Sequence, residues 1–293
     1  MGSNKLKYGN DILLFGGASL SYSPPVPSLP SHTVRCKFTE GYTPTMGDSQ
    51  TLVDADENIW DIYKAGDDWS YLLSGINALT EVVDFNAEGI TSTNAMCYGS
   101  RYLTSFKAYN TDSVTNMESM FLTCESLAYV DLGNPHPEGL RARQLFSGTA
   151  ITHAPQMDFS RITQGDYLFG GCRQLVSLPE YNFDSLVSGY NMFAGCIRLE
   201  HIPQFSMPNL ANATWMFYNL QSLRELPVLS LPNISRVDYM FNGCVNVESG
   251  ITAMYGYLSS ATYMRSHTWC FRNCGVNTES GAAELEGIPN DWK

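Results

Sequence analysis

Residues 192–203 read MFAGCIRLEHIP, and variants of this stretch recur along most of the chain. When the copies are aligned on Phe193, the anchor residues follow one another at intervals of 24, 24, 25, 23, 24, 24, 24 and 30 residues. So regular a period predicts a repeat architecture in which each copy is one unit that stacks on its neighbours. The anchors are Leu73, Cys97, Phe121, Phe146, Phe169, Phe193, Phe217, Phe241 and Phe271.

The first half of each copy predicts a compact turn. Met or Leu usually precedes the anchor, and the resulting Met-Phe pair indicates a short helical turn with one buried face. Gly or Asn lies two residues after most anchors, where either residue suits a left-handed conformation that ends a turn. Thr123 takes this position in one copy, so we expect backbone strain there.

The second half of each copy predicts a short extended strand. An aliphatic residue recurs six and nine residues after the anchor, which gives a Leu-x-x-Leu pattern. Pro179, Pro203 and Pro227 directly follow this pattern in three copies, and each ends the strand because proline cannot donate to a ladder. We expect one such strand per copy to pair in parallel with the next, over one shared core.

These patterns together predict an α/β solenoid that is leucine-rich-repeat-like. Residues 71–278 would form about nine 24-residue repeats with a parallel β-sheet and short helical turns. Residues 33–70 contain strand-like runs that indicate a small N-terminal β unit capping the first repeat. Residues 1–32 predict an N-terminal docking arm and Pro-rich linker, with a disordered tail as the alternative. Residues 279–293 are expected to form the C-terminal cap that a solenoid needs.

Two stretches carry a resemblance to a known family. Residues 110–121 (NTDSVTNMESMF) and 192–203 resemble the repeats of the BspA-type leucine-rich-repeat family. The resemblance covers about 220 residues and is interrupted at 133–155 and again between Phe241 and Phe271, where about six residues are inserted. Repeats of this type occur in bacterial surface proteins, lipoproteins and phage structural proteins. The resemblance implies binding to proteins or glycans rather than catalysis.

The charge and hydropathy of the chain exclude some partners. The formal net charge is −12 and the pI about 4.7, so a broad basic face for nucleic acid is not expected. No apolar run approaches the length of a membrane span, and Ile12 to Phe15 is too short for a signal peptide. We therefore expect a protein made in a cytoplasm, with no membrane span.

The cysteines and acidic residues are candidate covalent or metal sites. Most of the eight cysteines fall on one position of the repeat, which favours buried thiols over disulfides. Cys270 and Cys274 have no further pair to complete a zinc site. Asp54, Asp56 and Asn58 have the spacing that opens a calcium loop but lack its glycine and distant glutamate. No metal and no cofactor are therefore expected.

No catalytic motif is present in the sequence. The five histidines are scattered, and neither a nucleophile elbow nor a phosphate-binding loop occurs. Carboxylates are plentiful, but nothing marks an acid–base pair among them. We expect the protein not to be an enzyme.

Two columns of the repeat are candidate binding surfaces. Two residues before the anchor, aromatic side chains recur and would form a stripe suited to glycan stacking or protein contacts. Packing of these rings between the short helical turns is the alternative. Eight residues after most anchors the residue type varies while the core columns stay fixed, which is typical of a recognition face. The candidates are Tyr167, Trp215, Tyr239 and Trp269 in the first column and Tyr129, His201 and Glu225 in the second.

Two functional hypotheses follow. The first is a phage virion component of the tail or fibre, which docks to a larger assembly through residues 1–30 and recognises a host-surface protein or glycan. The alternative is a bacterial cell-surface adhesin with BspA-type repeats. The expected location is the virion, or the bacterial surface under the alternative. A homo-oligomer is compatible with either.

Overall fold

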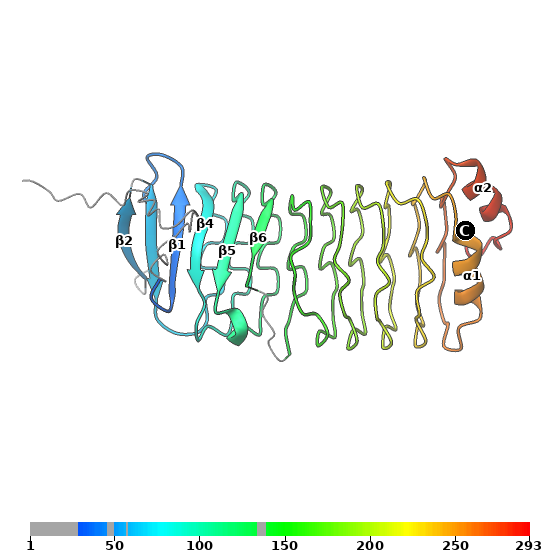
Figure 1. Ribbon diagram of the computed structural model, residues 1–293, viewed down its shortest axis with the longest axis horizontal. Helices are drawn as coiled ribbons and strands as arrows, with labels where there is room; N and C mark the ends of the chain where they lie inside the picture. Colours follow the sequence, from blue (N-terminus) through cyan, green and yellow to red (C-terminus); the bar gives the residue numbers. More distant parts are fainter. Residues whose placement is uncertain (1–28, 46–49, 57, 134–138) are drawn as a thin grey trace, which may run out of the picture.

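The computed structural model describes residues 29–45, 50–56, 58–133 and 139–293. Residues 1–28 of the expected docking arm and linker (1–32) and the residues 134–137 that interrupt the repeat pattern lie outside them. The described chain is mostly β structure and turns with few helices, arranged as successive windings side by side in one row (Figure 1).

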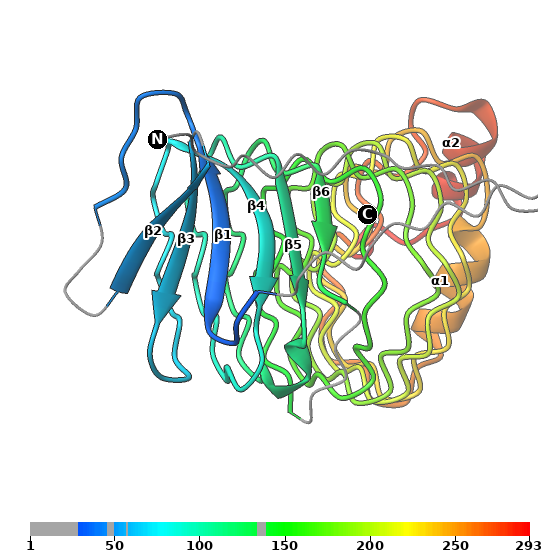
Figure 2. The same ribbon diagram turned by 60° about the vertical axis from the view of Figure 1, so that its left-hand side comes forward.

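The row begins with an open six-stranded sheet in the order β2-β3-β1-β4-β5-β6 (Figure 2). The first three strands pair antiparallel, and β1 pairs on its other side with β4, also antiparallel. From β4 onward the pairing is parallel, with each strand one winding further along the chain. The strands are β1 (Thr33–Phe38), β2 (Gln50–Asp56), β3 (Ile59–Lys64), β4 (Leu79–Asn86), β5 (Ser105–Tyr109) and β6 (Tyr129–Asp131).

The parallel sheet is shorter than the sequence predicts. Beyond β6, the side of the windings that carries the parallel strands has only isolated bridges in the described chain, such as His153 with Ser177 and Glu225 with Ser249. Pro179, Pro203 and Pro227 explain the loss, because each removes a backbone donor where the ladder would continue. The expectation of one regular strand per repeat is therefore wrong for these later windings.

The Met-Phe segment is not a helical turn, which corrects the prediction. In residues 165–172, alternate N–H groups donate to the carbonyl three residues earlier, as Cys172 does to Phe169 at 3.1 Å. The N–H groups between them donate to the next winding, as Phe169 does to the Met192 carbonyl at 2.9 Å. Tyr167 and Gly171 have φ values of 56° and 75°, and left-handed residues at this spacing exclude a right-handed helix. The segment is a ribbon of overlapping β-turns.

A column of phenylalanine rings forms the centre of the core. Successive anchor rings from Phe121 to Phe271 lie 5.2 to 5.8 Å apart, at interplanar angles of 18° or less. Every ring in this column is buried. Offset aromatic pairs contribute about 0.5–1.5 kcal/mol each beyond the area they bury. The anchor period of the sequence therefore corresponds to one ring per winding.

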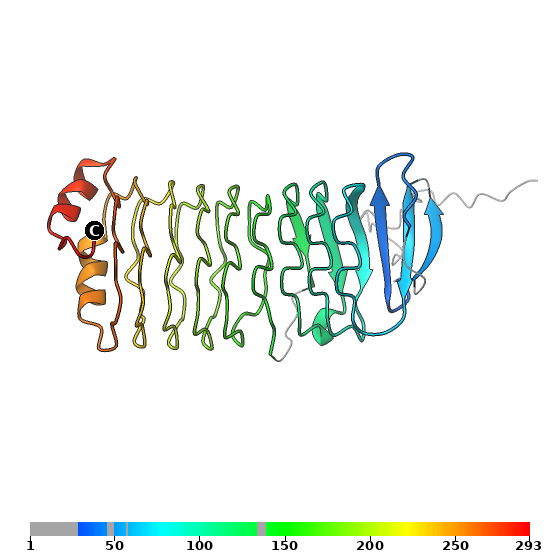
Figure 3. The ribbon, with the colours of Figure 1, turned by 180° about the vertical axis from the view of Figure 1, so that it is seen from behind.

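The far end of the row carries two α-helices (Figure 3). The helix α1 (Ile251–Ser259) accounts for the insertion between the last two anchors, and α2 (Glu279–Glu286) follows the last winding. The Phe271 N–H, which has no further winding to reach, donates to the Trp292 carbonyl at 2.8 Å. A single turn of 3-10 helix, η1 (Thr111–Ser113), lies between β5 and β6. In the described residues, neither helix has the length and hydrophobicity to span a bilayer.

The eight cysteines are all free and buried, as predicted for the repeat column. The Sγ atoms of Cys172 and Cys196 lie 3.0 and 3.2 Å from the carbonyl oxygens of Phe146 and Phe169 in the preceding winding. Burial raises the pKa of the Cys172 thiol to about 11 and that of Cys124 to about 12. Among the described residues, no group of three or more His, Cys, Asp or Glu side chains is placed to hold a metal.

The left-handed positions give opposite expectations for two substitutions. Gly195 has a φ of 74° and an added Cβ would meet nothing closer than 3.8 Å, so Gly195→Val should destabilise by backbone strain of about 1–2 kcal/mol. Thr123 has a φ of 59°, so Thr123→Gly should relieve strain and stabilise by about 1 kcal/mol. Gly256→Ala in α1, where an added Cβ has open space, is the helix control and should stabilise slightly. Chemical unfolding measures all three, and equal stabilities of the wild type and Gly195→Val would contradict the assigned conformation.

The thiol column makes stability depend on alkaline pH. Unfolded thiols ionise near their ordinary pKa of 9.0, whereas the buried thiols stay neutral because their pKa values are raised. The contribution of these thiols to the free energy of unfolding should therefore stay constant below about pH 9. It should decrease as the pH rises further. Replacing Cys172 and Cys244 with Ala should make that decrease shallower.

In the native protein near neutral pH a thiol reagent should label no cysteine, and rapid labelling of the native protein would be inconsistent with this column.

Candidate functional site

The aromatic stripe predicted from the sequence lies on the turn ribbon. Tyr167, Trp215, Tyr239 and Trp269 all adopt positive φ, between 52° and 60°. The sequence predicts a left-handed residue only after the anchor, because aromatic residues rarely adopt this conformation. The backbone hydrogen bonds between windings impose it, since every winding has a left-handed residue at this position.

The rings of the stripe contact one another along the row. Trp215 stacks on Tyr239 with ring centroids 4.0 Å apart, and Tyr239 meets the edge of Trp269 at 5.4 Å. The Arg272 guanidinium lies over the Trp269 ring, 4.2 Å from its centroid. Tyr167 stands further along the row and contacts Tyr190 at 5.5 Å. The rings therefore pack on each other between windings, and most of them remain half-buried.

The second candidate column lies on the strand side of the windings. Tyr129 begins β6 with 57% of its surface exposed, and His201 and Glu225 are exposed as well. The bridge between Glu225 and Ser249 holds this side in register from one winding to the next. The structure therefore places the seven predicted binding residues on two separate segments of the winding.

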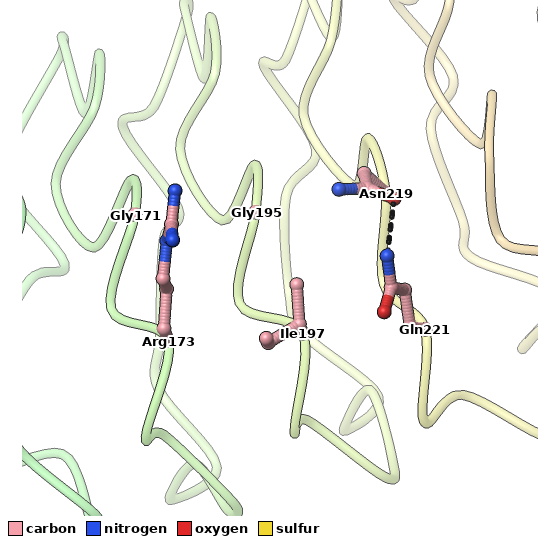
Figure 4. A pocket seen from close by; sticks show the side chains of 6 residues that line it. All are labelled: Gly171, Arg173, Gly195, Ile197, Asn219 and Gln221. Atoms are coloured by element: carbon pink, nitrogen blue, oxygen red, sulfur yellow. Dashed lines mark hydrogen bonds between the residues drawn. The ribbon is translucent and has the colours of Figure 1, made fainter.

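A groove that the sequence did not predict runs along the glycine column after the anchors. A pocket of about 320 Å³ spans three windings (Figure 4). A second pocket, of about 570 Å³, continues from it. The two share Gly171 and Arg173. We call them together the glycine trough. It is lined by Glu125, Ser147, Gly148, Thr149, Ala150, Gly170, Gly171, Arg173, Gln174, Gly195, Ile197, Asn219 and Gln221.

The trough exists because its floor has no side chains. Gly148, Gly171 and Gly195 occupy the same left-handed position in successive windings. A Cβ built on Gly171 would lie 3.8 Å from the Gly148 Cα, so the backbones approach closely enough for the glycines to form a continuous strip. The glycine column is visible in the sequence, where it indicates a turn but not a groove.

An aromatic ring of the stripe borders the trough. A Cβ built on Gly170 would lie 3.2 Å from Cδ1 of Tyr167, so this ring covers Gly170. Gly170 itself lines the larger pocket. Partial burial, with Tyr190 beside it, raises the pKa of the Tyr167 hydroxyl. The stripe and the trough therefore meet at Tyr167.

The walls of the trough carry polar side chains with unused hydrogen-bonding groups. Arg173 is exposed and makes no ion pair or hydrogen bond within the described chain. The Gln221 amide donates to Asn219 Oδ1 at 3.2 Å, and Figure 4 shows the Asn219 amide nitrogen directed away from that bond, toward Gly195. Gln174 accepts a hydrogen bond from Arg198 at 2.9 Å, and its own amide donors make no hydrogen bond to the residues that the structure describes. Ile197 adds one apolar contact between these groups.

A third pocket, of about 240 Å³, is lined by charged groups that neutralise each other. Arg141 pairs with Glu118 at 2.6 Å, and Arg143 lies 3.6 Å from Asp166. Because its arginines already have partners, this pocket offers less to a ligand than the trough does.

Comparison with known proteins gives two matches. No curated protein matches the sequence. Among solved structures, a leucine-rich cell surface protein from Faecalibacterium prausnitzii A2-165 matches at 16% identity and a TM-score of 0.31, over 83% of this chain and 89% of that chain. A TM-score this low carries no argument about this chain. The family model described as "Mycoplasma protein of unknown function, DUF285" matches residues 67–136 and 141–254, which make up more than half of the chain. The chain therefore belongs to the DUF285 family.

Proposed function

We propose that the protein is a non-enzymatic binding protein of the cell surface, an adhesin built on a leucine-rich-repeat-like solenoid of about nine repeats of the BspA type. The observation that carries this proposal is the division of each winding into a fixed interior and a variable exterior. The anchor ring and the buried cysteines recur from winding to winding, whereas Tyr129, His201 and Glu225 share one exposed column and differ in chemistry. A repeat frame with varied outward side chains is the usual arrangement of a recognition surface.

The adhesin proposal replaces the virion hypothesis as the preferred one. Neither the family description nor the description of the leucine-rich neighbour names a virion protein. The neighbour is described as a cell surface protein, which agrees with the alternative that the sequence left open. The support for an adhesin nevertheless comes from the division of the windings, because the structural likeness is too weak to add to it.

Binding of the labelled full-length chain to cells tests this proposal. We expect saturable binding to animal epithelial cells or to bacterial cells, measured by flow cytometry with unlabelled chain as competitor. A triple variant with Tyr129→Ala, His201→Ala and Glu225→Ala examines the strand column, and a double variant with Trp215→Ala and Tyr239→Ala examines the aromatic stripe. At least one should weaken binding roughly tenfold, the effect of losing about 1.4 kcal/mol.

The two variants need different controls. The strand-column residues are exposed, so their removal should leave the melting temperature unchanged. Trp215 and Tyr239 stack on each other, so their removal is compared with Trp215→Phe, which keeps a ring in the stack. Absence of saturable binding to every cell type, with the chain folded, would contradict an adhesin.

A further inference from the structure

The six-stranded sheet ends in a strand that has a neighbour on one side only. β2 pairs with β3, and no described strand lies on its other side (Figure 2). In an edge strand of this kind, alternate N–H and C=O groups point away from the neighbour and can pair with one more strand. At the other end of the sheet the windings continue beyond β6 (Figure 1). The sheet can therefore be extended at β2.

The charge of this edge argues against a second copy of the chain as the added strand. Residues 48–57, which include β2, contain four acidic residues and no lysine or arginine. Two copies that paired through β2 would bring two such sets of carboxylates together, and like charges on paired strands are destabilising. The edge therefore fits a strand that carries positive charge.

The N-terminal arm has the required charge. Residues 1–22 contain Lys5 and Lys7 and a single acidic residue, Asp11, although the whole chain has a net charge of −12. The arm is thus a basic segment of an acidic protein. Residues 5–8 read KLKY and alternate charged with apolar side chains, which is the pattern of a strand.

The lysines of the arm and the aspartates of β2 have the same spacing. Lys5 and Lys7 are separated by one residue, as are Asp54 and Asp56. In an antiparallel pair with Lys5 opposite Asp56, Lys7 falls opposite Asp54. The register of β2 against β3 shifts between the two aspartates. Long side chains also reach diagonal neighbours, so this irregularity does not prevent the two ion pairs.

Leu29, the first described residue, fixes the place where the arm leaves the sheet. Its N–H donates to the Tyr109 hydroxyl at 2.8 Å, and its carbonyl accepts from the Asn86 amide at 2.7 Å. Asn86 pairs with Thr33, so Leu29 lies at the end of the sheet where β1 begins. β2 begins at this end too, because β3 runs antiparallel to both β1 and β2. A segment that follows β2 and leads directly to Leu29 therefore runs antiparallel to β2.

The linker between the basic residues and Leu29 has a suitable length. A strand added beyond β2 would lie four strand spacings from β4, or about 19 Å. A flexible linker as long as residues 11–28 has a root-mean-square end-to-end distance of roughly 23 Å. A tether that matches its span gives an effective concentration in the millimolar range. The arm of the same chain therefore outcompetes a strand from another molecule at ordinary protein concentrations.

We propose that residues 5–10 add a seventh strand to the sheet, antiparallel to β2 of the same chain, with Lys5 beside Asp56 and Lys7 beside Asp54. The added strand covers the open edge and so keeps it from pairing with strands of other molecules. The arm that the sequence predicts to dock onto a larger assembly then has its partner within its own chain. This inference does not rest on the proposed function.

Hydrogen–deuterium exchange of the full-length chain, measured on the peptide that covers β2, tests the proposal. The double variant Lys5→Glu with Lys7→Glu gives the arm the same charge as the edge, so the β2 amides should exchange roughly tenfold faster. Adding Asp54→Lys and Asp56→Lys to this variant should restore slow exchange, because both ion pairs form again with their signs reversed. Exchange that stays fast in the quadruple variant would contradict the assigned register.

Lys107 provides a matched control on the same sheet. It is exposed and pairs with Asp84 at 3.4 Å, and β5, which carries it, is separated from β2 by three other strands. Lys107→Glu should therefore leave the exchange of β2 unchanged. Equal exchange of β2 in the wild type and in Lys5→Glu with Lys7→Glu would overturn the proposal. An equal acceleration by Lys107→Glu would overturn it too, since the effect would then be one of general charge.

Protein concentration separates the arm from a second copy. Pairing within one chain gives the same exchange of β2 at every concentration, and light scattering should show a monomer under conditions where β2 is protected. Protection that increases with concentration, together with a dimer in light scattering, would assign the edge to a second copy and overturn the proposal.

Discussion

The structure depends on the hydrogen bond that each anchor residue makes to the next winding. The Phe193 N–H donates to the Met216 carbonyl at 2.9 Å, and Phe217 does the same to Met240 at 3.0 Å. This bond sets the distance between windings at which the anchor rings stack. It also requires the alternation of right- and left-handed residues that turns the segment into a ribbon of β-turns. No single winding can satisfy these groups, so the windings are stable only as a row.

The sequence predicted those features that one residue type can specify by itself. The anchor period gave the Phe column, and glycine after the anchor indicated a left-handed residue, which Gly195 and the strained Thr123 both confirm. The cysteines were correctly predicted to be buried and free. In each case the side chain has a local preference that the fold uses directly.

The predictions that were wrong or missing concern features that depend on hydrogen bonds and contacts between windings. The left-handed conformation of Trp215 contradicts the preference of an aromatic residue, so no local signal could indicate it. The Met-Phe pair suggested a helix because hydrophobic spacing alone does not distinguish a helix from a turn ribbon. The trough was missed because it arises where glycines of several windings come together, and the ring of Tyr167 borders it only in three dimensions.

Native-state hydrogen exchange tests the dependence of the whole row on the anchor bond. If the bond between windings is the organising interaction, the amides of Phe169, Phe193 and Phe217 should exchange only by global unfolding and share one free energy of opening. The amide of Ile59, the first residue of β3, is not part of this column and serves as the comparison. Rapid or unequal exchange at the three anchor amides, in a protein that is otherwise folded, would contradict the account.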